Sequence, residues 1–460
     1  MRSQNQRQAL RERSHTEPAK KSGARKTDDF LPYERVTLAF VLLLCGFYVL
    51  YFDEAGLSGL SSAKRTAFYL LGCGYPAMLA LLTGFSLCTG AMHWCALWER
   101  LRQSSAAMLL MLAYLLFTLI SALVSPYGSA VWLGNSRFEG VVTIALYVAD
   151  FYLVALFARP GRLPLYVLGA SMLLLCTVSI LQIHGGNPLG LYRGEQSFAA
   201  LNGSHVGTIG NVGFVGGLFC LAIPLFLCAL LRLKEPWRFA LLLPLLACVY
   251  VLLRIWVLAA FVGLGGGLAL ALPFVLRLEK RGLVLWFSAL GALGLAALAV
   301  LWGWDAGSGF LHELHELLHG RSSPTFGTGR FFIWQQLFPR ISQRLWFGYG
   351  PDTMGLVGLT PFSRYDAELG RTVYASIDAA HNEYLNVLFH QGVFALAAYL
   401  GALGCSLRRF VKHARSSPAA AMLGTAVLCY MIQALFGISQ LIVAPLFWLC
   451  LGLLEADGRR

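Results

Sequence analysis

The chain has few charged residues for its length. Of its 460 residues, only 13% are charged and 57% are hydrophobic, whereas about 25% of the residues in soluble domains are charged. The apolar residues stand in long runs and follow neither a helical nor a strand period. This composition excludes an ordinary soluble globular domain.

Several sequence signatures are also missing. There is no Gly-rich phosphate loop and no dinucleotide-binding fingerprint, which argues against a cytoplasmic nucleotide site. No short apolar stretch with a small-residue cleavage site is found near the N-terminus, so we expect no signal peptide. All eleven cysteines lie in or beside the apolar runs, which argues against a disulfide scaffold and a cysteine metal site.

The apolar runs are the dominant positive feature. A run of about 17 to 25 apolar residues spans a ~30 Å hydrocarbon core as a helix. We therefore predict an all-α polytopic membrane protein of about twelve transmembrane helices, with one large extracytoplasmic loop that carries short helices. The expected spans are 36–52, 66–92, 106–124, 138–158, 162–184, 211–231, 239–252, 256–276, 282–302, 384–404, 419–435 and 440–455.

The division between two of these spans depends on one charged residue. The apolar stretch 239–276 could form one long helix, but Arg254 stands at its middle. A lone arginine buried in lipid costs several kcal/mol. We therefore predict two shorter helices that turn at Arg254.

The basic residues predict the orientation. Most of the 36 Lys and Arg precede the first apolar run or stand in alternate loops, and such loops face the cytoplasm. Their dispersal over many loops argues against a nucleic-acid partner. The predicted order is a disordered cytoplasmic tail at 1–35, helices 1 to 9 at 36–302, a catalytic extracytoplasmic loop at 303–383, and helices 10 to 12 with a short cytoplasmic C-terminus at 384–460.

The loop 303–383 has periodic stretches of its own. His312 to Leu318 predicts a short amphipathic helix, and Arg330 to Leu345 predicts another, broken or kinked at Pro339. Such helices can lie at the headgroup level, or they can form a soluble cap with a small core.

Arginines on the predicted outer face suggest the chemistry. The planar guanidinium of arginine can grip a phosphate or diphosphate at two points, so an outer cluster of arginines suits a lipid-linked diphosphate. The alternative for each arginine is that it flanks a helix or pairs with a nearby acid.

Five short segments narrow these alternatives. They are Arg137-Phe138-Glu139-Gly140, Gly207-Thr208-Ile209-Gly210-Asn211, Gly329-Arg330-Phe331-Phe332-Ile333-Trp334, Gly348-Tyr349-Gly350-Pro351, and His381-Asn382-Glu383-Tyr384-Leu385 followed by Gly392. In order, spacing and predicted sidedness, this set resembles the O-antigen ligase and polymerase family.

The resemblance implies a membrane glycosyltransferase with named site residues. Arg330 would bind the donor diphosphate, and His381 would act as a base or steady the charge on the leaving group. Arg254 would be a second diphosphate ligand, although Leu253 and Ile255 depart from the neighbours usual in the family. Arg193 and Arg137 are further donor-binding candidates, and Asp378 and Asn382 are possible orienting residues.

The resemblance also implies partners and location. The donor would be a glycan on undecaprenyl diphosphate, and the acceptor a hydroxyl of a glycan or lipid, with no metal and no cofactor. The protein would be a multi-pass protein of the bacterial inner membrane, in contact with membrane lipids, with its site on the extracytoplasmic face. A polysaccharide polymerase with the same donor class is one alternative, and a transporter or non-catalytic envelope protein is another.

Two further patterns have ordinary explanations. His312, His315 and His319 have a spacing that can bind zinc, but a solvated amphipathic helix explains them better. Asp53-Glu54 resembles the acidic pair of protein mannosyltransferases, yet acids that flank a helix end are common.

Overall fold

The structure, a computed structural model, describes residues 30–159, 161–321, 323, 326–366 and 371–457. Most of the tail expected at 1–35 lies outside the described residues. The first described helix begins at Leu31 with a proline in its first turn, ahead of the predicted span 36–52. Proline is well suited to this position because its fixed φ fits the helix and its missing N–H is not needed there.

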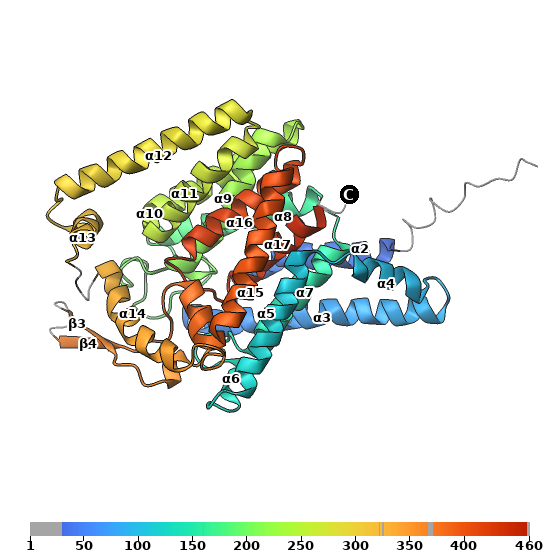
Figure 1. Ribbon diagram of the computed structural model, residues 1–460, viewed down its shortest axis with the longest axis horizontal. Helices are drawn as coiled ribbons and strands as arrows, with labels where there is room; N and C mark the ends of the chain where they lie inside the picture. Colours follow the sequence, from blue (N-terminus) through green and yellow to red (C-terminus); the bar gives the residue numbers. More distant parts are fainter. Residues whose placement is uncertain (1–29, 160, 322, 324–325, 367–370, 458–460) are drawn as a thin grey trace, which may run out of the picture.

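Helices make up most of the described chain (Figure 1). They are α2 (Leu31–Leu43), α3 (Leu60–Cys88), α4 (Trp94–Arg102), α5 (Ala106–Leu123), α6 (Ala130–Leu133), α7 (Val141–Phe157), α8 (Leu163–Ile183), α9 (Val212–Arg232), α10 (Leu242–Ile255), α11 (Leu258–Val275), α12 (Lys280–Gly303), α13 (Gly309–Leu318), α14 (Phe326–Gln343), α15 (Glu383–His413), α16 (Pro418–Gln433) and α17 (Ala444–Asp457).

The structure confirms an all-α polytopic membrane protein. In the described residues, nine helices are long and apolar enough to cross a membrane, and α7 and α16 are shorter apolar helices. Each of the twelve predicted spans corresponds to a helix. The last of them, α17, has 14 residues, nearly all buried among the other helices, and so rises only about 21 Å.

The predicted turn at Arg254 is present. Helix α10 ends at Ile255, and Trp256 adopts a left-handed conformation with φ 48° before α11 begins at Leu258. The charged side chain therefore stands at a helix end instead of in the middle of a span.

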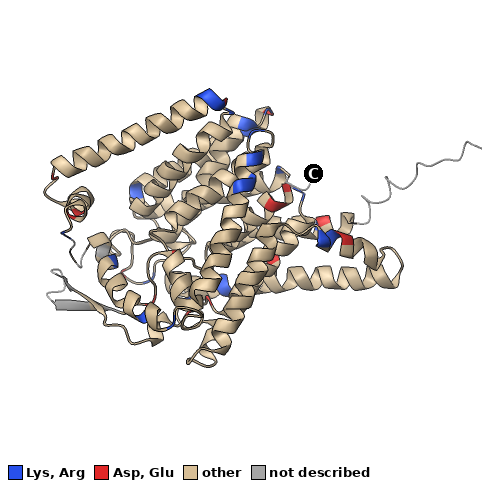
Figure 2. Ribbon diagram, in the orientation of Figure 1, with Lys and Arg blue, Asp and Glu red and all other residues tan. Residues whose placement is uncertain are grey.

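The long helices alternate in direction and form one bundle. Charged residues lie mostly near helix ends (Figure 2), although Asp150 stands within α7. We call the end at which α7, α9, α11 and α15 begin the site end, and the other end, at which α2, α5, α8 and α16 begin, the opposite end.

Helix α9 is the centre of the bundle. It contacts α8, α10, α11, α16 and α17, and most of its residues are buried. The Gly207-to-Asn211 segment starts it: strands β1 (His205–Val206) and β2 (Gly210–Asn211) pair antiparallel, and the Asn211 side chain accepts a hydrogen bond from the Gly213 N–H at 2.8 Å. This motif therefore caps the central helix.

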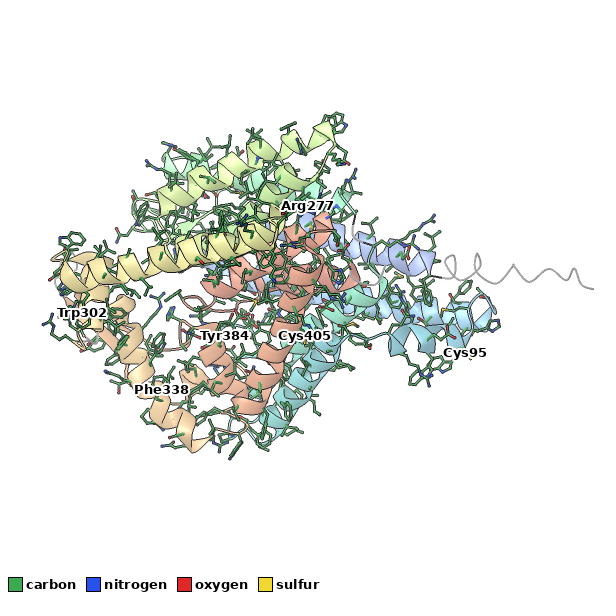
Figure 3. The ribbon with its side chains drawn as sticks, turned by 45° about the horizontal axis from the view of Figure 1, so that its top comes forward. Cys95, Arg277, Trp302, Phe338, Tyr384 and Cys405 are labelled. Atoms are coloured by element: carbon green, nitrogen blue, oxygen red, sulfur yellow. The ribbon has the colours of Figure 1, made fainter. Side chains whose placement is uncertain are left out.

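Helix α12 has the opposite character. None of its residues is buried, and it runs along the edge of the bundle (Figure 1). At its last turn Trp302, labelled in Figure 3, stacks on His319 with ring centroids 4.5 Å apart. This contact packs the end of α12 against the end of α13, in the loop that follows α12.

The loop 303–383 contains both predicted helices and one element that was not predicted. Helix α13 confirms the amphipathic stretch at His312, and α14 confirms the second helix, with Pro339 inside it. Strands β3 (Phe362–Asp366) and β4 (Arg371–Ala375) form an antiparallel hairpin with Phe362 opposite Ala375. Buried residues of this region, including Ile333, Leu337 and Ile377, form a small core of their own, as the cap interpretation requires.

Three glycines lock this cap to α15. Gly392 interrupts α15 with φ 84°, and a Cβ there would lie 2.2 Å from the Trp346 carbonyl oxygen. The N–H groups of Tyr349 and Gly350 donate to the Phe389 and His390 carbonyls at 3.1 and 2.8 Å. A Cβ at Gly348 would lie 2.4 Å from the His390 carbonyl oxygen. The Gly-x-Gly turn and Gly392 therefore serve one close backbone contact.

Candidate active site

Helix α14 holds Arg330 at the site end. Its guanidinium donates to the Gly327 carbonyl at 2.6 Å and to the Phe436 carbonyl, beyond the end of α16, at 2.9 Å. Glu313 on α13 accepts a hydrogen bond from the Gly327 N–H at 3.1 Å. These contacts orient the guanidinium plane and join α13, α14 and the bundle at one point.

The backbone around His381 is fixed on both sides. The Trp334 indole donates to the Ala380 carbonyl at 2.8 Å, and the Ala380 N–H donates to Asn386 Oδ1 at 2.7 Å. Asn382 caps α15 by accepting from the Leu385 N–H at 2.9 Å. His381 itself has φ 50°, a conformation that a histidine adopts only when its surroundings impose it.

Arg137 joins the same group from a distant part of the sequence. Its guanidinium donates to Asp378 Oδ1 at 2.7 Å. Asp352, which is only 2% exposed, accepts from the N–H groups of Asn135, Ser136 and Arg137 at 2.8, 3.1 and 2.9 Å. One buried carboxylate therefore shapes the turn that presents Arg137.

Electrostatics show that these residues share one site. Burial and the positive charges of Arg330 and Arg137 together lower the pKa of His381 to about 4, against the opposing charge of Asp378. Burial also lowers the pKa of Arg330. At neutral pH the site thus presents two cationic guanidinium groups beside an uncharged imidazole.

Asp378 has a different partner from the expected one. It was predicted to orient His381, but its recorded hydrogen bond is with Arg137. Its charge still acts on His381, because it opposes the lowering of the histidine pKa. Asn382 orients His381 only indirectly, through the backbone of the helix start.

A polar pocket continues from Arg137 and Asp378 into the bundle. It is lined by Glu139, Asp352, Glu383 and His390 among others. The Tyr147 hydroxyl donates to Glu139 at 2.9 Å. Burial raises the pKa of Glu139 to about 8, with added repulsion from Asp352 and Glu383, so this carboxyl group holds a proton at neutral pH.

Two predicted donor ligands lie apart from this group. Arg193 contacts the first loop of the site end, where it lines a cavity with Asp53 and Glu54. Arg254 is exposed at the end of α10, and no contact between it and Arg330 or His381 is recorded in the described part of the chain. The structure therefore brings together Arg330, His381, Arg137 and Asp378, but not Arg193 or Arg254.

The three histidines do not form one cluster: the rings of His315 and His319 lie 4.2 Å apart, but His312 has a different partner. His315 bonds the Leu301 carbonyl at 2.7 Å, His319 stacks on Trp302, and His312 bonds Asp305 at 2.6 Å. Asp305, His312 and Glu316 bring one donor atom each within 4.8 Å of one another, although Glu316 is paired with Arg321 at 2.7 Å. The three imidazoles thus fasten α13 to α12 and its neighbouring loop.

Sequence reasoning missed Asp352 and the polar pocket. Asp352 follows directly on Gly348-Tyr349-Gly350-Pro351 and has φ 54°, so its place after a glycine-rich turn was the available signal. Glu139 and Glu383 lie within two of the five segments noted, but nothing in the sequence says that they meet.

One family model matches part of the chain. Residues 257–400 match the family model described as O-antigen ligase. This segment contains Arg330, Asp378 and His381, while Arg137 lies outside it. No curated protein matches the chain.

Proposed function

We propose that this chain belongs to the O-antigen ligase family and transfers a glycan from undecaprenyl diphosphate to an acceptor hydroxyl on the extracytoplasmic face of a bacterial inner membrane. The match of residues 257–400 to the O-antigen ligase family model supports a ligase- or polymerase-like role in glycan assembly. Donor, acceptor and membrane face are the proposed parts.

The observation that carries the proposal is the convergence of Arg330 and Arg137 on His381. A diphosphate leaving group needs cations to stabilise its developing charge more than it needs an acid, and two guanidinium groups supply them. A scaffold protein could use the contacts of each arginine, but it has no need to place both positive charges where they act on one histidine.

The bonds and protons balance without a metal. The acceptor oxygen attacks the anomeric carbon, the bond from that carbon to the diphosphate oxygen breaks, and its electron pair leaves with the diphosphate. The neutral imidazole of His381 takes the hydroxyl proton. Configuration at the anomeric carbon is inverted by this single displacement.

Donor binding would also activate the base. The pKa of His381 is about 4 partly because of Arg330 and Arg137. A bound diphosphate offsets these positive charges and raises the histidine pKa toward its ordinary value of about 6.5. His381 would thus become a stronger base only when the donor is in place.

Variants of the two central residues test the assignment. Arg330→Lys keeps the charge but loses the planar fork, so donor binding should be strongly impaired. His381→Ala should slow transfer by roughly 10²–10⁴-fold while donor binding stays largely intact. Both are measured with purified protein in nanodiscs, as lipid-linked donor binding and as single-turnover transfer.

Arg340→Lys is the matched control, since Arg340 lies on the same helix α14 and should behave as the parent. The assignment is overturned if His381→Ala abolishes donor binding while Arg330→Ala spares both binding and transfer. Full activity of both variants would refute the proposed function itself.

A labelling experiment tests the membrane face. Ser342 is exposed on α14, so a Ser342→Cys variant of a cysteine-free chain should react in intact spheroplasts with a membrane-impermeant maleimide. A cysteine at Lys234, an exposed residue of the opposite end, should react only after lysis. The reverse pattern would contradict the proposed orientation.

A further inference from the structure

An apolar cavity lies at the opposite end of the bundle, far from the candidate active site. Its volume is about 310 Å³, roughly twice that of an engineered apolar cavity of about 150 Å³ that binds benzene. Its walls come from α2, α8, α9, α16 and α17, and include Leu38, Leu168, Leu221 and Leu449.

The cavity runs along the helices. Helix α2 and the π-helical turn after it (Leu44–Tyr48) line the cavity from Leu31 to Cys45, which corresponds to about 21 Å at the rise of an α-helix. That length covers more than half of a ~30 Å hydrocarbon core. A long apolar space parallel to the helix axes has the shape of a lipid acyl chain.

The mouth of the cavity carries charge. Arg35 and Arg159 line it together with Glu34, and Glu34 is paired with Arg159 at 2.6 Å. Arg100 lies near enough that the charges of Glu34 and Arg159 act on its pKa. Three arginines against one acid leave the mouth cationic.

We propose that this cavity binds one acyl chain of an anionic phospholipid whose headgroup phosphate contacts Arg35 and Arg159. The combination of an apolar interior and a cationic mouth matches a lipid tail below an anionic headgroup. The donor lipid is a poorer occupant because its diphosphate is assigned to Arg330, at the other end of the same helices. This inference is independent of the proposed glycan transfer.

Native mass spectrometry of the purified full-length chain tests the site. The probes are phosphatidylglycerol and phosphatidylcholine with identical palmitoyl and oleoyl chains. One phosphatidylglycerol per chain should be retained in preference to phosphatidylcholine, and Arg35→Gln should reduce that preference by roughly fivefold, the effect of one basic residue near an anionic surface.

Glu34→Gln should act in the opposite direction. It removes the one acid at the mouth and releases Arg159, so the preference for phosphatidylglycerol should increase. Lys234→Gln removes a basic residue at the same end that does not line the cavity, and should leave the preference within twofold of the parent.

Two further variants separate the cavity from the surface. Leu38→Trp, at an exposed position of the wall, and Ala419→Phe, at a partly buried one, both fill the space and should abolish retention of the lipid. The melting temperature of each variant shows whether it is folded, and a folded variant of either kind suffices.

The proposal is overturned if phosphatidylcholine is retained equally well, or if folded Leu38→Trp protein retains phosphatidylglycerol like the parent. It is also overturned if a polyprenyl phosphate displaces the phospholipid and depends on Arg35 in the same way, because the occupant would then be the isoprenoid lipid. Loss of glycan transfer in an unrelated assay would not bear on these outcomes.

Discussion

Arginines occupy both ends of the bundle, but they have different roles at the two ends. At the opposite end, Arg232 is 9% exposed and donates to the carbonyls of Val275, Ala414 and Arg415 at 3.1, 2.6 and 3.0 Å. It thereby satisfies the carbonyls at the ends of α11 and α15, where a cation also complements the helix dipole.

At the site end, Arg137 and Arg330 also have partners, yet they converge. Arg137 pairs with Asp378, Arg330 bonds two carbonyls, and the charges of both act on His381. A buried arginine is therefore no sign of a site in itself. What distinguishes the site end is that two arginines from distant segments meet beside one titratable side chain.

The largest loss of stability is expected at the opposite end, where it tests the structural role of Arg232. Arg232→Ala leaves three helix-end carbonyls without their charged donor, which should lower the free energy of unfolding by roughly 2–4 kcal/mol. Thermal unfolding in detergent measures it, and Arg330→Ala, at a more exposed position, should unfold closer to the parent. If Arg330→Ala is the less stable of the two, Arg330 has mainly a structural role.

A smaller loss of stability is expected at Asp352, which shapes the turn that presents Arg137. Asp352→Asn keeps one acceptor oxygen but loses the charge that three N–H groups share, and should destabilise the protein by about 1–3 kcal/mol. It should also weaken donor binding, because the turn that presents Arg137 loosens. Asp378→Asn, which removes the charge from a partly exposed pair but keeps an acceptor oxygen, should cost less, about 1 kcal/mol. Equal stability of both variants with the parent would contradict the role given to Asp352.

The pH dependence of transfer tests whether the arginines of the site end act on His381. The neutral form of His381 is needed, and its pKa of about 4 in the donor-free protein places the acid limb of kcat/KM near pH 4. The acid limb of kcat should lie at higher pH, because the bound diphosphate raises the pKa. Coincident limbs in the two profiles would argue against activation of His381 by the donor.

The smallest effect on transfer at pH 7 is expected at Glu139. Its pKa is raised from 4.5 to about 8, so between these values the folded protein holds a proton that the unfolded chain releases. Stability should therefore fall as the pH rises through this window. Glu139→Gln mimics the neutral form, so it should flatten this dependence while transfer at pH 7 stays within a few-fold of the parent. An unchanged pH profile of stability would mean that Glu139 is ionised.

Much of the fold could be predicted because apolar length is a strong local signal. Every predicted span corresponds to a helix, and Arg254 correctly marked the turn between α10 and α11. Burial could not be predicted in the same way. Helices α9 and α12 are both apolar enough to cross a membrane, yet one is the centre of the bundle and the other has no buried residue, because lipid and protein interior are equally apolar.

The site could also be predicted in part, where its residues belong to short local motifs. Short motifs gave Arg330, His381 and Arg137, because their neighbours Trp334, Asn382 and Glu139 stand beside them in the sequence. The Asp352 contact with Arg137 spans more than two hundred residues, and no local pattern encodes it. Arg193 and Arg254 were candidates because they too are arginines on the predicted outer face. Only the tertiary structure separates them from the group around His381.

The contact between Arg330 and the Phe436 carbonyl has a consequence for biogenesis. A chain is made from its N-terminus, so Arg137 is inserted long before Asp352 and Asp378, and Arg330 long before Phe436. The group around His381 is therefore completed only after nearly the whole chain has left the ribosome. A partly synthesised chain lacks part of this group, so under the proposed function it would not act as a transferase in the membrane while the protein is being built.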